Sequence, residues 1–208
     1  MMKHIVRLAP LLAILVLWSL PASRTAQAQA EWVAALRGGG HVIVFLVLVR
    51  RDAFNVATRS INFANLDKQR PLNDAGRAKA REIGEAFRKL KIPVGQVHTS
   101  MFNRAIETGK LAFGEAMPTP DLTEGVVTPI ENHRRALALR KLAATVPPAG
   151  TNVVAVTHKP NILDAFGKDW FEVREGEASL FKPDGVGGSK LVMRVQADDW
   201  MKLAQAAN

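Results

Sequence analysis

The feature that most constrains the fold is an unbroken apolar run, Val42–Val49 (VIVFLVLV), which lies between three glycines and two arginines. A strand with one solvated face alternates apolar and polar residues, whereas a strand covered on both faces is apolar throughout. The run therefore predicts a central strand with helices on both sides of its sheet. A second run, Thr151–Thr157 (TNVVAVT), predicts another buried strand.

Helical segments alternate with these strands. The segment from Asn73 through about Leu90 opens with Asn-Asp-Ala-Gly, carries apolar residues at approximately helical spacing and stops before Pro93. The remaining predicted elements are strands over 95–100, 177–181 and 190–196, helices over 104–113 and 134–145, and a glycine-rich turn over 184–188. This alternation predicts an α/β three-layer sandwich, with a mostly parallel sheet and helices on both faces.

Residues 1–30 have the layout of a cleavable signal peptide. Two basic residues precede an apolar run from Leu8 to Leu20, and two Ala-x-Ala sequences follow it. The run is short for a membrane span, so a retained membrane anchor is the less favoured alternative. We therefore expect a periplasmic or secreted protein with a single domain over residues 31–208.

The composition excludes several kinds of reactive group and metal site. The 208 residues include no cysteine, which excludes disulfides, thiolate nucleophiles and cysteine-ligated metals. Removal of residues 1–30, which hold three basic residues and no acidic ones, lowers the formal charge from +9 to +6. A mature chain of this charge is expected to be attracted to anionic surfaces, and a cationic envelope protein without ligand specificity is one alternative function. Specific recognition of nucleic acid is not expected.

In such sheets, ligands bind beyond the carboxyl ends of the strands. The position of each histidine relative to these ends therefore indicates whether it can contact a ligand. His158 directly follows the strand predicted over 151–157 and is the strongest candidate for a functional histidine. His41 precedes the first strand and is expected to be a solvated residue at the opposite edge. His98 is expected to pack within its strand, and His133 to be exposed. The histidine spacing predicts no metal site.

A second candidate site is the segment 99–108 (TSMFNRAIET). A hydroxyl-rich strand end followed by Arg104 in the first helical turn brings together backbone N–H groups, the positive end of a helix dipole and a guanidinium. This combination suits a phosphate or another oxyanion. The alternative is a helix cap by Ser100, with Arg104 paired to a neighbouring acid.

These segments resemble motifs of the histidine phosphatase superfamily, which has the phosphoglycerate-mutase-like fold. Segment 99–108 resembles the family's strand-exit motif and places its phosphate-binding arginine at Arg104. Segment 156–162 (VTHKPNI) resembles the family's later histidine motif and places that histidine at His158.

Three further segments extend the resemblance over nearly the whole mature chain. Segment 121–125 (DLTEG) resembles the part of the family that supplies a proton donor, which assigns Glu124 to this role. Segments 69–76 (QRPLNDAG) and 176–179 (GEAS) also fit the family pattern. Because the matches occur in order, together they are more specific than any one alone.

The resemblance implies phosphomonoester hydrolysis in two steps, without a metal or another cofactor. One histidine attacks phosphorus, arginines and a second histidine stabilise the transferring oxygens, and a carboxyl group protonates the leaving oxygen. It implies His158 and Glu124 as catalytic residues, and Ser100, Arg104 and His158 as phosphate-binding residues. The implied partner is a phosphorylated small molecule or a phosphate group of the cell envelope.

One essential part of the family pattern is missing. The family has Arg-His-Gly directly after the first strand, where Phe45 is followed here by Leu46-Val47-Leu48. Leu46 replaces a phosphate-binding arginine, and Val47 replaces the attacking histidine. We therefore expect impaired phosphomonoester hydrolysis. The alternative is a non-catalytic binder of phosphate-bearing ligands.

The nucleotide sequence distinguishes two origins of this difference. In a shifted reading frame, suitable codons for Leu46–Arg51 encode Arg-x-Gly-Ala-Thr, which suggests a compensated frameshift or a sequencing error. Ordinary divergence of a strand is the alternative, and incompatible codons would establish it. Arg50 and Arg51 are not expected to replace the lost groups, because an extended chain carries them ~13 Å beyond the required position.

Overall fold

The computed structural model of the chain describes residues 30–48, 63, 69–125 and 128–206. Residues 1–29, which make up nearly all of the predicted signal peptide, lie outside the described residues, as do Arg50 and Arg51. Within the described part, no helix has the length and apolar character that crossing a membrane requires.

A mixed sheet of six strands forms the middle layer, in the order β3-β2-β4-β1-β5-β6. The strands are β1 (Val42–Leu46), β2 (Val94–Ser100), β3 (Met117–Thr119), β4 (Asn152–Thr157), β5 (Ala178–Pro183) and β6 (Ser189–Val195). The four strands from β3 to β1 run parallel, while β5 and β6 are antiparallel to their neighbours. The two apolar runs thus form the adjacent strands β1 and β4 inside the sheet.

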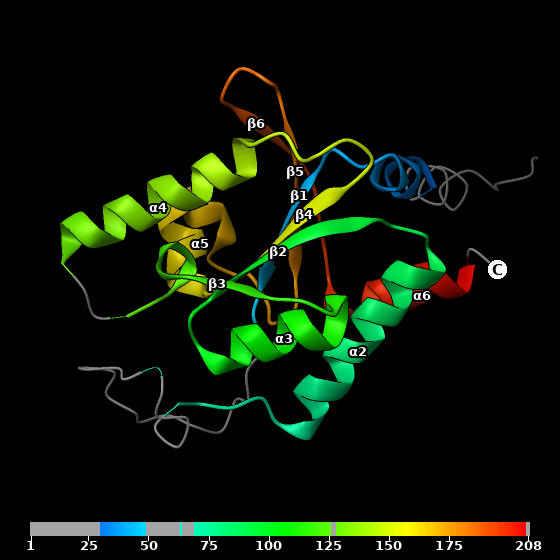
Figure 1. Ribbon diagram of the computed structural model, residues 1–208, viewed down its shortest axis with the longest axis horizontal. Helices are drawn as coiled ribbons and strands as arrows, with labels where there is room; N and C mark the ends of the chain where they lie inside the picture. Colours follow the sequence, from blue (N-terminus) through cyan, green and yellow to red (C-terminus); the bar gives the residue numbers. More distant parts are fainter. Residues whose placement is uncertain (1–29, 49–62, 64–68, 126–127, 207–208) are drawn as a thin grey trace, which may run out of the picture.

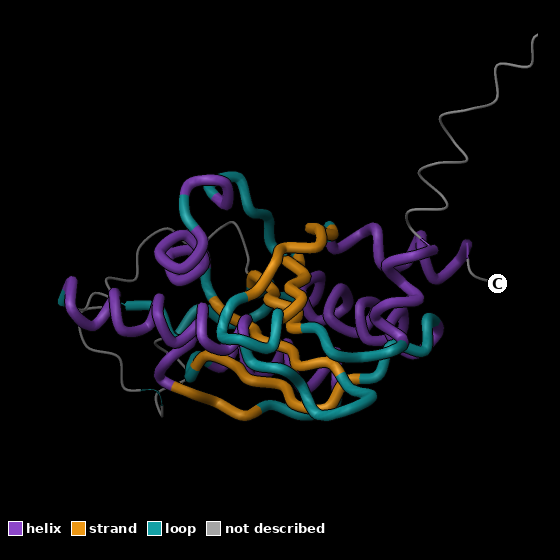
Figure 2. The backbone as a smooth tube through the Cα atoms, turned by 90° about the horizontal axis from the view of Figure 1, so that it is seen from above, coloured by secondary structure: helices purple, strands orange, loops and turns teal. Residues whose placement is uncertain are grey.

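Helices cover both faces of this sheet. They are α2 (Asp74–Lys89), α3 (Asn103–Phe113), α4 (Pro129–Ala144), α5 (Lys159–Phe166) and α6 (Ala197–Ala206), with 3-10 turns η2 (Pro120–Leu122) and η3 (Lys168–Trp170). Residues 30–37 are also helical. The sheet lies between the α4–α5 pair and the group of α2, α3 and α6 (Figure 1), and the view from above again places helices to either side of the strands (Figure 2). The predicted fold class is confirmed.

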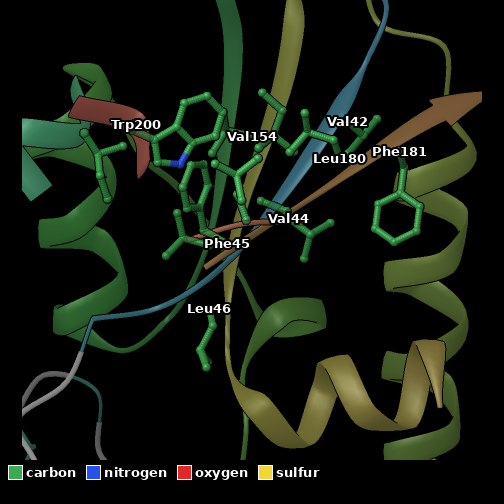
Figure 3. Packing of buried hydrophobic residues seen from close by; sticks show 14 of the residues in the cluster. Val42, Val44, Phe45, Leu46, Val154, Leu180, Phe181 and Trp200 are labelled. Atoms are coloured by element: carbon green, nitrogen blue, oxygen red, sulfur yellow. The ribbon is translucent and has the colours of Figure 1, made fainter. Parts of the chain in front are cut away.

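Strand β1 joins the two halves of the core, because every one of its residues is buried. Val44 and Phe45 point to opposite sides of the strand (Figure 3). The Phe45 ring lies 5.7 Å from the Phe113 ring of α3 and 6.3 Å from the Trp200 ring of α6, measured between centroids. A continuous apolar sequence is therefore what this position requires.

Several element boundaries differ from the predictions for local reasons. The first strand ends at Leu46, three residues before the predicted end, and single backbone hydrogen bonds from Gly176 N to the Leu46 carbonyl and from Val47 N to the Thr157 carbonyl follow it. Helix α4 begins at Pro129, five residues before the predicted start, because the Thr128 hydroxyl caps it by accepting from Glu131 N at 3.2 Å. No sequence pattern predicted β3, α5, α6 or the helix over residues 30–37.

The prediction of a solvated His41 is wrong, although the residue does lie at the amino end of β1. Only 5% of its surface is exposed. Its backbone N donates to Asn152 Oδ1 at 3.1 Å, and its Nδ1 lies 3.0 Å from Gly39 O. Burial and the nearby Lys182 charge lower the pKa of His41 below its ordinary value. Its contacts belong to the core rather than to a ligand site.

Replacing Val44 tests the central position of β1. Val44 is fully buried, so Val44→Asp would place an unpaired carboxylate inside the sheet and lower the free energy of unfolding by about 4 kcal/mol. Val186→Asp is the matched control, because Val186 is 89% exposed and the same change there is expected to cost less than about 0.5 kcal/mol. Urea titrations measure both, and a Val44→Asp variant as stable as the control would contradict the strand assignment.

Candidate active site

Two adjacent strand ends bring Arg104 and His158 together. Strands β2 and β4 are parallel neighbours, so their carboxyl ends lie at the same edge of the sheet. Helix α3 starts after β2 and carries Arg104 in its first turn, and His158 is the residue between β4 and α5. Both are buried, with 2% of each residue exposed, and Arg104 Nη2 lies 3.3 Å from His158 Nδ1.

Glu124 completes this group, which we call the Arg104 cluster: Arg104, Glu124 and His158. Its Oε1 accepts a short hydrogen bond from Arg104 Nη2 and lies 3.4 Å from His158 Nδ1. The Arg70 guanidinium adds a second positive charge, with Nη2 3.9 Å from the same oxygen. The three residues that the sequence suggested separately therefore meet at one place.

Ser100 is buried beside the cluster, where its hydroxyl holds the loop between β2 and α3. Ser100 Oγ accepts from Phe102 N at 3.2 Å and donates to Thr123 Oγ1 at 3.4 Å. Thr123 Oγ1 also accepts from Met101 N at 2.9 Å. Of the alternative interpretation of this segment, the pairing of Arg104 with an acid occurs. Ser100 does not cap the helix, because the N-cap of α3 is Phe102, which makes no side-chain cap hydrogen bond.

The sequence analysis did not single out Thr123, Arg70 or Phe102. Thr123 and Arg70 lie inside segments that resemble family motifs, so their place in these segments could have identified them as site residues. Phe102 likewise lies inside the quoted segment 99–108, and its ring centroid lies 4.1 Å from Arg104 Cζ and 5.3 Å from the His158 ring. Such aromatic contacts hold a guanidinium and an imidazole in fixed orientations.

Burial controls the charges of the cluster. It lowers the pKa of Arg104 to about 10, against the opposing effect of the Glu124 carboxylate, so the guanidinium stays positive at neutral pH. Burial and the charges of Arg104 and Arg70 lower the pKa of His158 well below its ordinary value, so this imidazole is neutral. Because a guanidinium only donates, a neutral His158 that accepts at Nδ1 carries its proton on Nε2.

Two buried donors of the cluster have no hydrogen-bond partner among the described residues: Arg104 Nε and His158 Nε2. A buried donor without an acceptor costs about 1–3 kcal/mol. A ligand oxygen that accepted from either atom would remove that cost. The cluster therefore has both the charge and the unused donors that an oxyanion needs.

The position that the resemblance gives to the attacking histidine adjoins the cluster. Val47 is fully buried, and its backbone N donates at 2.9 Å to the carbonyl of Thr157, the residue before His158. Leu46 lies at the end of β1, apart from the Phe45–Trp200 packing (Figure 3). The chain thus places apolar side chains at this strand end, beside an intact group of polar residues.

A pocket of about 260 Å³ opens next to Glu124. Its lining residues come from four segments, including α4 and α5: Arg70, Glu124, Gly125, Asn132, Arg135, Pro160, Asn161 and Asp164. In the part of the chain that the structure describes, no three histidine, aspartate or glutamate side chains are grouped so that they could hold a metal ion.

The pH dependence of stability tests the burial of His158. Its pKa is lower in the folded than in the unfolded chain, so the native state loses stability as pH falls below the ordinary value near 6.5. His158→Gln is expected to remove about 1 kcal/mol of the stability loss between pH 8 and pH 5.5. The pKa values of His41 and His98 are lowered as well, so part of the dependence remains in the variant. Urea unfolding at both pH values measures this, and an unchanged loss in the variant would contradict the assignment.

No protein-family model and no curated protein matches this chain. Several solved structures, however, are similar to it. The protein histidine phosphatase SixA, complexed with tungstate, is 17% identical with a TM-score of 0.52, and the match covers 76% of this chain and 98% of SixA. The alpha-ribazole phosphatase from Shigella flexneri is 12% identical with a TM-score of 0.54, over 76% of this chain and 96% of its own. An Escherichia coli protein described as an alpha-ribazole-5′-P phosphatase is 12% identical with a TM-score of 0.57, over 76% and 98%. The chain therefore has the same fold as these phosphatases, which agrees with the phosphoglycerate-mutase-like fold that the sequence motifs predicted.

Proposed function

We propose that this protein binds phosphate-bearing ligands through Arg104 and His158, and that phosphoryl transfer through a phosphohistidine is impaired in it. The proposal rests on one observation, the contrast between a polar cluster and an apolar residue at the same edge of the sheet. The Arg104 cluster is assembled there, while Val47, in the place of the attacking histidine, is a buried apolar residue.

Binding is supported by the charge and the free donors of the cluster. Arg104 keeps its positive charge, and a guanidinium forms strong, charge-assisted hydrogen bonds with the oxygens of a phosphate. His158 adds a neutral donor at Nε2, which is buried and has no acceptor among the described residues. A phosphate oxygen is a suitable acceptor for this donor.

Impaired catalysis is supported by the positions of the histidines. A covalent nucleophile needs a lone pair within reach of phosphorus, which an isopropyl side chain does not supply. Of the four histidines among the described residues, only His158 belongs to the cluster: His41 lies at the opposite edge, His98 within β2, and His133 is exposed on α4. The resemblance assigns His158 to the side of the phosphate, and geometry decides first whether a group can attack.

Phosphomonoester hydrolysis is the second candidate function. The observation that favours it is the Glu124 carboxylate 3.4 Å from His158 Nδ1, since the resemblance makes Glu124 the proton donor. The proposal also includes a location outside the cytoplasm, which rests on the signal peptide predicted over residues 1–30. There the ligand would be a phosphorylated small molecule or a phosphate group of the envelope.

Calorimetric titration with tungstate, an oxyanion of phosphate-like shape, tests the binding site. Arg104→Ala and His158→Ala are each expected to weaken binding at least about tenfold, because each removes a buried donor. Arg88→Ala is the matched control for lost positive charge, since Arg88 is exposed on α2, and its affinity is expected to stay within about twofold. If the unmodified chain and the three variants bound tungstate with equal affinity, the assignment of the binding site to Arg104 and His158 would be wrong.

Turnover of an aryl phosphate separates the two candidate functions. The chain is expected to release no more phosphate than its His158→Ala variant and to form no acid-labile phosphoenzyme, because loss of a covalent nucleophile costs several orders of magnitude. Combining Leu46→Arg, Val47→His and Leu48→Gly is expected to produce measurable turnover, with circular dichroism as the check on folding. Robust turnover by the unmodified chain, abolished in His158→Ala, would instead support hydrolysis.

A further inference from the structure

The Glu124 carboxylate occupies the position in which the Arg104 cluster would hold a ligand oxygen. Its Oε1 accepts from Arg104 Nη2, and it lies 3.4 Å from His158 Nδ1 and 3.9 Å from Arg70 Nη2. This oxygen thus pairs with two guanidinium groups from separate segments, whereas the neutral His158, which carries its proton on Nε2, offers no donor at Nδ1. Phosphate oxygens bound by arginines are held in the same manner.

Glu124 also lies between the pocket and the other members of the cluster. Glu124 and Arg70 line the pocket, whereas Arg104 and His158 are not among its described lining residues. The side chain of Glu124 is 21% exposed, compared with 3% for Arg104 and 2% for His158. A ligand that enters from the pocket therefore meets Glu124 before it reaches the buried donors.

We infer that Glu124 is an internal competitor for the oxyanion site, and that a ligand binds there by displacing its carboxylate. This inference rests on the proposed function and adds to it a residue that limits affinity and selects the ligand by charge. It differs from the role of Glu124 as a proton donor, which concerns only the departure of a leaving group.

Charge balance indicates which ligands can displace the carboxylate. The guanidinium groups of Arg104 and Arg70 face one carboxylate, and His158 is neutral, so the group carries one net positive charge while Glu124 is in place. A monoanion that replaced Glu124 would leave this balance unchanged. A dianion, such as a phosphate monoester or tungstate, would pair with both guanidinium groups and is therefore favoured.

The pocket offers the displaced carboxylate a polar environment. Asn132 and Arg135 of α4 line it, together with Asn161 of α5. Arg135 is held beside the pocket by hydrogen bonds from its Nη1 to the Thr123 carbonyl and from its Nε to the Glu131 carboxylate, with which it forms an ion pair. A carboxylate that turns away from Arg104 can thus remain close to a cation and to amide donors.

Calorimetric titration with tungstate of the unmodified chain and two matched variants tests the inference. Glu124→Gln keeps the size of the side chain and removes its charge, so tungstate affinity is expected to rise about tenfold. Asp164→Asn is the control, because Asp164 lines the same pocket and is exposed on α5 but does not belong to the cluster. Its affinity is expected to stay within about twofold of the unmodified chain. Glu124→Ala provides a second variant with the same expected direction, and circular dichroism checks all three folds.

Nitrate, a monoanion, supplies a further arm of the experiment. It is expected to compete with tungstate in Glu124→Gln but not in the unmodified chain, where it cannot displace the carboxylate. Weaker tungstate binding in both Glu124 variants would overturn the inference and leave the proposed binding function standing. If Asp164→Asn raised the tungstate affinity equally, the effect would come from the loss of any negative charge near the pocket. This outcome would also overturn the inference. If no variant binds tungstate while all are folded, the proposed function itself fails.

Discussion

The ion pair between the buried guanidinium of Arg104 and the Glu124 carboxylate is the interaction on which the rest of the site depends. A charge with this little exposure is costly unless it is paired and hydrogen-bonded. The pair fixes the loop that carries Glu124 against the start of α3, and it brings both groups to His158. Because β2 and β4 are parallel neighbours, the sheet places the arginine and the histidine at one edge before any ligand is present. We propose that an external anion binds by exchanging one partner of this pair for another.

The apolar residues of β1 belong to the core, whereas the attacking histidine that the resemblance implies would stand just beyond this strand, at position 47. The strand is buried on both sides, so an apolar Leu46-Val47-Leu48 is compatible with the core and extends it. The contacts that hold this strand end are backbone hydrogen bonds to Thr157 and Glu177, which do not depend on side-chain identity. A chain can consequently keep the fold and most of the polar groups of the site while it lacks the group that would attack phosphorus.

Local sequence patterns predicted the parts of the fold that have a local cause. The apolar runs of β1 and β4 and the Asn73 cap of α2 each follow from neighbouring residues, and the strand-end rule found Arg104 and His158. The burial of His41 could not be predicted, because it depends on Asn152, more than a hundred positions away. Strand β3 has three residues, one of them a proline, and shows no periodicity. Glu124 was assigned only through the resemblance, since its contact with Arg104 arises from tertiary structure.

We propose that the Arg104 cluster is an oxyanion site without a covalent nucleophile. A crystal structure of the unmodified chain with tungstate tests it most directly, because it shows the position of the anion, its ligands and Glu124 at once. The account predicts the anion within hydrogen-bonding distance of Arg104 and His158, with no bond to a protein atom, and the Glu124 carboxylate turned into the neighbouring pocket. An anion bound elsewhere, with the Arg104–Glu124 pair unchanged, would contradict it, as would tungsten bonded to a histidine nitrogen.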